Sequence, residues 1–219
     1  MVDLIRGLTA DRVRSNLERV RERIAATGRD PADVEILAAV KYLPAEELGT
    51  LADGGVTVVG ENRAQELAAK AAAVPGRFTW DFIGRLQSRK VRDLVGRVRY
   101  IHSVASDSAL AQLARHATPD TQIMVEVNVA GEADKGGVLP AELGAFLARS
   151  PVDVVGLMTM PPLAARPDDS RPHFAALRAL AEEHGLRELS MGTSQDYVVA
   201  VEEGATIVRL GTILYASAS

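Results

Sequence analysis

The feature that most constrains the fold of this chain is a regular alternation of apolar, strand-length runs and helix-like stretches. Eight such runs occur, and the residues between most of them place apolar side chains at helical spacing. Several runs are apolar on both faces, which is typical of parallel strands covered by helices. The predicted strands span 34–40, 56–59, 79–83, 98–102, 122–128, 152–157, 188–191 and 206–210.

A helix-like stretch follows each of the first seven strands, and the eighth strand runs into a short tail. This order predicts an α/β fold, a (β/α)8 TIM barrel, because eight repeats of one period favour closure over the runner-up, an open doubly wound sheet. Apolar residues at helical spacing predict an extra N-terminal helix over 10–27. The predicted barrel helices span 44–53, 62–73, 87–95, 106–117, 140–149, 172–184 and 194–203.

Composition bounds the class of protein. The chain has 219 residues, 47% of them hydrophobic, and no low-complexity linker, so we expect one domain over 1–219. A net charge of −4 gives no positive field for nucleic acid or an anionic membrane. Without cysteine there is neither a disulfide nor a thiolate nucleophile. The N-terminus is charged throughout and no apolar run could span a bilayer, so we expect a cytoplasmic protein.

Lys41 directly follows the first predicted strand, in a chain with only four lysines. An isolated lysine at a strand end is more often a solvated charge than a functional group. In a barrel, however, functional groups gather where strands end. A lysine rooted there among apolar side chains would lose hydration, which would lower its pKa and free its amine to attack an aldehyde.

The loops after the last two strands predict a phosphate site. The stretch "SMGTS", residues 190–194, leads into a predicted helix whose N-terminus would present free amides, with hydroxyls from Thr193 and Ser194. Gly211, after the eighth strand, would allow close backbone approach. An equally weighted alternative is that Ser194 only caps the helix and that Gly192 only makes a turn.

Together, an amine and a phosphate cradle at one barrel mouth suggest a phosphorylated aldehyde. Pyridoxal 5′-phosphate (PLP) and the substrate of a sugar-phosphate aldolase both fit. Arg209, at the end of the eighth strand, is a candidate partner for a pyridine nitrogen, although pairing with the phosphate or with another side chain would explain it as well. An arginine there stays protonated and donates, which would weaken the cofactor as an electron sink.

The chain resembles the pyridoxal phosphate homeostasis proteins, which are related to the N-terminal barrel of alanine racemase. The resemblance covers nearly the whole chain and rests on seven motifs in one order. The motifs are AAVKYLP, GENRAQE, WDFIGRLQSRK, IHSV, VEVNVAGEADKGG, VVGLMTMPP and LSMGTSQDYVVAVEEGATIVRLGTILY.

The resemblance implies that Lys41 holds PLP as a Schiff base, that Ser194 and the amides around Gly192 and Gly211 hold the phosphate, and that Arg209 faces the pyridine nitrogen. Asn62 and Met158 would line the pocket. The full set implied for cofactor binding is Lys41, Asn62, Ile83, Met158, Ser190, Gly192, Thr193, Ser194, Arg209 and Gly211.

Some positions depart from the family pattern. Val40 stands where serine or threonine is usual, Asp81 and Arg85 where histidines are common, and Thr193 where methionine is common. The chain ends in "LYAS" where "FG" is usual. None of these changes removes the amine, the phosphate hydroxyl or the arginine, so they concern the tuning of affinity.

The resemblance implies a protein that binds PLP and maintains vitamin B6 homeostasis rather than an enzyme. Racemisation needs a second base, which alanine racemase takes from an added β-domain. Tyr42 should point away from Lys41 by strand alternation, and Tyr215 lies in the tail. The alternative is a PLP-dependent, racemase-like enzyme acting on a small amino acid; a Schiff-base aldolase is a third possibility.

Other ligands have little support in the sequence. The four histidines, His102, His116, His173 and His184, lack the paired spacing of a metal site, so we predict no metal. The basic stretch 85–99 is not interleaved with stacking aromatics, so we interpret it as a solvated helix face rather than a nucleic-acid site. We expect PLP and other B6 vitamers as ligands, transient contact with apoenzymes, and a monomer.

Overall fold

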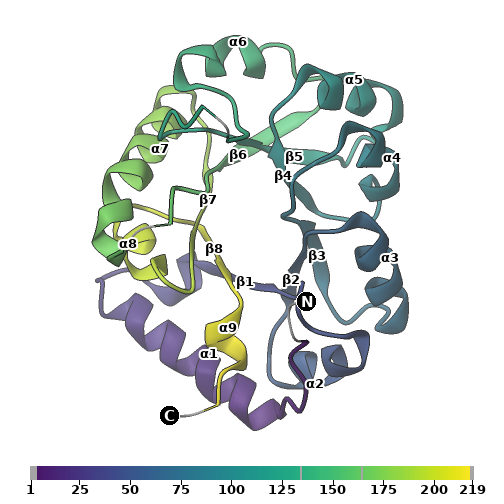
Figure 1. The fold of residues 1–219 in the computed structure, drawn as a ribbon, viewed down its shortest axis with the longest axis vertical. Helices are drawn as coiled ribbons and strands as arrows, with labels where there is room; N and C mark the ends of the chain where they lie inside the picture. The colour runs from purple at the N-terminus through teal and green to yellow at the C-terminus, as the bar shows by residue number, and fades with distance from the viewer. Residues whose placement is uncertain (1–3, 134, 164, 218–219) are drawn as a thin grey trace.

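The protein folds as a closed barrel of eight parallel strands in chain order, surrounded by helices (Figure 1). The computed structural model describes residues 4–133, 135–163 and 165–217. Each strand pairs with the next, and the last pairs with the first, which confirms the predicted (β/α)8 barrel and excludes the open sheet. The strands are β1 Glu35–Ala39, β2 Val58–Glu61, β3 Thr79–Phe82, β4 Tyr100–Val104, β5 Gln122–Glu126, β6 Asp153–Met158, β7 Glu188–Thr193 and β8 Ile207–Leu210.

Helices form the outer ring of Figure 1, and those between strands fall at the predicted stretches, although α2, α4 and α6 are shorter than predicted. Short 3-10 turns lead into several of them, as at Ala45–Glu47 before α2. The helices are α1 Ala10–Ala25, α2 Leu48–Asp53, α3 Ala64–Ala73, α4 Val91–Leu94, α5 Asp107–His116, α6 Leu143–Leu147, α7 Arg171–Glu183, α8 Tyr197–Glu202 and α9 Thr212–Tyr215.

The first and last helices lie side by side (Figure 1). Thr9 caps α1 as an N-cap residue, accepting a hydrogen bond from the Arg12 amide, and the apolar face of α1 is buried. The side-chain amide of Asn16 on α1 donates through Nδ2 to the carbonyls of Leu214 at 2.9 Å and Ala216 at 3.1 Å. Helix α9 was not predicted because four residues are too few to show a period.

Two apolar layers form the core. The larger one lies between strands and helices and includes Trp80 and Phe82, so these two side chains point outward from the barrel. The second is a small cluster formed by Leu37, Val58, Met124, Met158 and Ile207. Buried polar and charged side chains also lie inside the barrel, where Arg209, Ser190, His102 and Asp81 are joined by hydrogen bonds, so the interior is not purely apolar.

Among the residues that the structure describes, no helix is long and apolar enough to cross a membrane. Within the same residues, no group of three or more His, Asp or Glu side chains is arranged to hold a metal ion.

Candidate functional site

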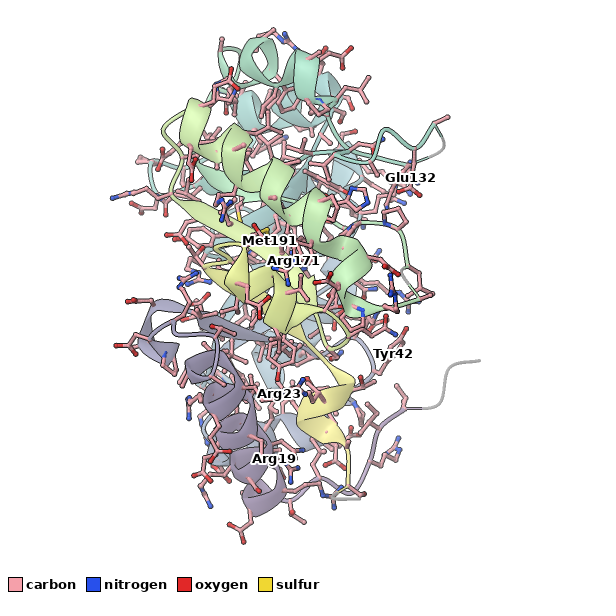
Figure 2. The ribbon with its side chains drawn as sticks, turned by 90° about the vertical axis from the view of Figure 1, so that its left-hand side faces the viewer. Arg19, Arg23, Tyr42, Glu132, Arg171 and Met191 are labelled. Atoms are coloured by element: carbon pink, nitrogen blue, oxygen red, sulfur yellow. The ribbon has the colours of Figure 1, made fainter. Side chains whose placement is uncertain are left out.

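The carboxyl ends of the eight parallel strands open on one side of the barrel, which we call the barrel mouth. Tyr42, after β1, and Glu132, after β5, lie along the same edge of the molecule (Figure 2). A Cβ on Gly84 would lie 2.1 Å from the Asn62 carbonyl oxygen, so the ends of β2 and β3 are in close contact. Of the predicted site residues, Ser190 lies in the middle of β7 and Arg209 is the third residue of β8. The others lie near or just after strand ends: Lys41, Asn62, Ile83, Met158, Gly192, Thr193, Ser194 and Gly211.

Lys41 is exposed, and the expectation of a dehydrated amine is wrong for this structure. Strand β1 ends at Ala39, so Lys41 lies in the following turn rather than among the strand's apolar neighbours. The Lys41 Nζ lies over the Tyr42 ring, 4.7 Å from its centroid. The expectation that Tyr42 points away from Lys41 is also wrong, because strand alternation does not continue into a turn. The amine is placed by the end of β1 and by an aromatic face.

A buried ion pair holds the backbone next to Lys41. The Lys70 Nζ donates to the Val40 carbonyl at 2.8 Å and to Glu61 Oε2 at 2.6 Å. Lys70 is 6% exposed and Glu61 is fully buried. The other carboxylate oxygen of Glu61 accepts a hydrogen bond from the backbone N–H of Asn62 at 2.7 Å. One ion pair therefore fixes the ends of both β1 and β2.

A second buried side chain holds the same segment. The Tyr215 hydroxyl donates to the Ala39 carbonyl at 3.0 Å. Burial raises the pKa of Tyr215, so its hydroxyl stays protonated and is not a free base. A Cβ on Gly211 would lie 3.8 Å from the Ala39 Cβ. The ends of β1 and β8 therefore adjoin, which brings the Lys41 turn next to the segment after β8.

The segments after β7 and β8 form a polar rim, which we define by Gly192, Ser194, Gln195 and Gly211. The Gly211 amide donates to the Ser194 Oγ at 3.2 Å. Gly192 has a φ of 91°, which favours glycine. Among the described residues, the amides of Ser194 and Gln195 have no hydrogen-bond acceptor. A hydroxyl and two unused amides make a donor set that suits a phosphate.

Two details of the sequence-based expectation change here. Helix α8 begins at Tyr197 after Asp196 as N-cap residue, so the alternative in which Ser194 caps the helix is wrong. The Thr193 amide and hydroxyl both donate to Asp196 Oδ1, at 2.7 and 3.0 Å. Thr193 therefore holds the turn, and Ser194 is the rim residue whose hydroxyl proton is available.

Arg209, on β8, is buried at the mouth and 6% exposed. Its Nη1 donates to the Ser190 carbonyl and to Ser190 Oγ, each at 2.6 Å, and its Nη2 donates to the Thr159 carbonyl and Met160 Sδ, each at 2.8 Å. Burial lowers the pKa of Arg209 to about 10, so it remains protonated at neutral pH. Among the described residues, its Nε–H has no acceptor.

The sequence analysis missed two buried residues that contact this arrangement. His102 Nδ1 lies 2.9 Å from the Ser190 Oγ, and His102 Nε2 lies 3.1 Å from Asp81 Oδ2. Both His102 and Asp81 are fully buried. The available signal was strand alternation: if Trp80 and Phe82 face outward, Asp81 must face the barrel interior.

Glu126, the last residue of β5, was also missed. Burial raises its pKa, although the positive charges of Arg209, Arg85 and Lys135 oppose that effect. The Glu126 carboxyl therefore ionises less readily than usual, and the positive charge of Arg209 acts on it at the barrel mouth.

Comparison with known proteins decides the family. The model of the family described as "Alanine racemase, N-terminal domain" matches residues 8–219. A protein of Aquifex aeolicus named pyridoxal phosphate homeostasis protein is 40% identical, over 94% of this chain and 96% of its own. The chain belongs to the pyridoxal phosphate homeostasis protein family. Another member of the family, from Pseudomonas aeruginosa, is 36% identical over 94% of each chain.

Solved structures share this fold. PipY of Synechococcus elongatus, solved with PLP bound, has a TM-score of 0.80 and 32% identity, over 93% of this chain and 100% of its own. Alanine racemase of Corynebacterium glutamicum has a TM-score of 0.74 at 16% identity, over 99% of this chain and 64% of its own. The racemase comparison supports the fold alone.

Proposed function

We propose that this protein binds PLP at the barrel mouth and maintains the intracellular level of this cofactor, without fast catalysis of its own. The observation that carries the proposal is the polar rim at the adjoining ends of β7 and β8, beside the Lys41 turn and with the Arg209 Nε–H available. The names of the relatives and the PLP bound to PipY support the same ligand.

In this proposal each residue at the mouth has a role. Lys41 holds the cofactor as a Schiff base, and Ser194 with the amides of the rim holds its phosphate. Arg209 donates to the pyridine nitrogen. The remaining residues, which line the site or shape its turns, are Asn62, Ile83, Met158, Ser190, Gly192, Thr193 and Gly211.

When bound, PLP supplies an aldehyde that condenses with primary amines and a ring that can withdraw electrons. Arg209 limits the second property, because a protonated guanidinium donates to the ring nitrogen and disfavours its protonation. Tyr215 is no second base, since its hydroxyl is committed to the Ala39 carbonyl. These residues favour holding the cofactor over fast amino-acid chemistry.

The wider role follows from this chemistry. A protein that holds PLP reversibly can store it and release it to apoenzymes through transient contacts. We infer a cytoplasmic monomer whose ligands are PLP and other B6 vitamers that share its ring and phosphate.

The first test measures binding and turnover in one sample. Titration with PLP should give saturable binding of one equivalent per chain. Prolonged incubation of the loaded protein with L-alanine, followed by chiral chromatography, should yield no more D-alanine than one equivalent of protein. Many turnovers would instead support a racemase-like enzyme, and absence of saturable PLP binding would refute the proposal.

A further inference from the structure

A continuous chain of hydrogen bonds runs through the barrel interior from Arg209 toward the opposite end. It passes from Arg209 to the Ser190 Oγ at 2.6 Å, to His102 Nδ1 at 2.9 Å, and from His102 Nε2 to Asp81 Oδ2 at 3.1 Å. Arg99 then binds Asp81 through Nε at 3.1 Å and through Nη2 at 2.6 Å. We call Ser190, His102 and Asp81 the interior relay.

The far end of this chain is anchored by charge. The Arg99 Nη1 and Nη2 donate to the two carboxylate oxygens of Glu35 at 2.7 and 2.5 Å. A two-point arginine–carboxylate contact of this kind fixes the guanidinium plane as well as its position. Asp81 therefore receives hydrogen bonds from an arginine that is itself held in place.

The two arginines fix the direction of each hydrogen bond between them. A guanidinium can only donate, so the Ser190 Oγ accepts from Arg209 and the Asp81 carboxylate accepts from Arg99. An ionised carboxylate can only accept, so the His102 Nε2–H donates to Asp81; in a neutral ring Nδ1 then carries no proton and accepts from the Ser190 hydroxyl. Burial lowers the pKa of His102, against the opposing effect of Asp81, which is consistent with a neutral ring. Burial opposes ionisation of Asp81 as well, but hydrogen bonds from His102 and Arg99 outweigh it and lower the pKa of Asp81.

This direction has a consequence at the mouth. All four terminal hydrogens of Arg209 have acceptors, two of them on Ser190. If the Ser190 hydroxyl proton pointed toward Arg209, the guanidinium would lose one acceptor and could turn. The His102 ring holds that hydroxyl in place.

We propose that His102 and Asp81 are positioning residues that hold Arg209 with its Nε–H directed to the ring nitrogen of the cofactor. This inference rests on the proposed function and deepens it. Neither residue touches the cofactor in this scheme; both act through Ser190.

The test compares PLP with 1-deazapyridoxal 5′-phosphate, whose ring has carbon in place of the nitrogen. In His102→Leu, the dissociation constant for PLP should rise about tenfold, as expected for one hydrogen bond to a charged group, while that for the deaza compound changes less than about twofold. His102→Gln, which keeps one acceptor and one donor, should bind PLP within about threefold of wild type.

Thr206→Val is the matched control. In the wild-type protein the Thr206 hydroxyl donates to Glu188 Oε2 at 2.7 Å and accepts a hydrogen bond from the Leu189 backbone N–H at 2.8 Å. It therefore links β7 to the segment before β8, away from the mouth. This variant should bind both compounds as wild type does. Equal loss of both compounds in His102→Leu, or no loss of either, would overturn the positioning role while the proposed function stands. A wild-type protein that binds neither compound would overturn both.

A measurement on wild-type protein tests the same claim without relying on a variant that folds. The chain has four histidines, so their imidazole ¹⁵N signals can be resolved by NMR. His102 should be neutral at pH 7, with the proton on Nε2 and an unprotonated Nδ1. A proton on Nδ1 would reverse the hydrogen bond to Ser190 and contradict the relay.

Discussion

Replacing Lys70 with alanine is expected to lower the free energy of unfolding by about 3–5 kcal/mol, a large fraction of a typical domain's stability. The fully buried carboxylate of Glu61 would lose its partner at 2.6 Å, and the Val40 carbonyl would lose its donor at 2.8 Å. An unpaired charge in a water-excluded site is costly because nothing replaces its hydration. The effect should also reach Lys41, because the turn that carries it begins at the freed carbonyl.

Urea denaturation measures this change, and two variants serve as controls. Lys90→Ala removes a more exposed pair, Lys90 with Asp93 at 3.3 Å, and should cost less than about 1 kcal/mol. The double variant Glu61→Gln/Lys70→Met leaves no buried charge at this position and should recover much of the loss. If Lys70→Ala cost no more than Lys90→Ala, the ion pair would not be what holds the ends of β1 and β2.

Gly192→Ala is expected to have the largest effect on PLP binding after loss of the lysine itself. The φ of Gly192 is 91°, a conformation that L residues rarely adopt. An added Cβ would also lie 2.6 Å from the Ala200 Cβ and 3.0 Å from the Tyr197 Cα, both on α8. Either the turn or α8 must move, so the amides of Ser194 and Gln195 would leave their present positions.

We expect Gly192→Ala to weaken PLP binding at least about a hundredfold and to lower the free energy of unfolding by about 2–5 kcal/mol. Fluorescence titration and urea denaturation give the two values. Gly49→Ala is the matched control: Gly49 lies within α2, no atom lies within 4 Å of the added Cβ, and alanine there should be neutral or stabilising. Wild-type affinity in Gly192→Ala would show that this turn does not hold the phosphate.

The fold was predictable because its signals are local. Each strand is an apolar run and each major helix has a period, so their order alone indicated a barrel and placed the candidate residues at strand ends. The helix α9 carried no such signal. The position of α9 depends on Asn16, almost two hundred residues earlier in the chain, whose side chain donates to the Leu214 carbonyl.

The details of the site were less predictable because they depend on where each strand stops and on which strands face each other. Strand β1 ends two residues before Lys41, so the lysine is exposed rather than dehydrated. The contact between His102 and Ser190 joins residues 88 positions apart, and sequence spacing alone does not reveal it. The hydroxyl of Thr193 made it a reasonable candidate to bind phosphate, but only the structure shows that Thr193 donates to Asp196 instead.

The most direct test of this account maps the covalent attachment of the cofactor. Wild-type protein is saturated with PLP, reduced with borohydride, digested and analysed by mass spectrometry; the chain's four lysines make the mapping unambiguous. We predict one pyridoxyl group per chain, on Lys41, and none in Lys41→Ala. A modified Lys70, Lys90 or Lys135 in place of Lys41, or an undiminished yield in Lys41→Ala, would contradict it.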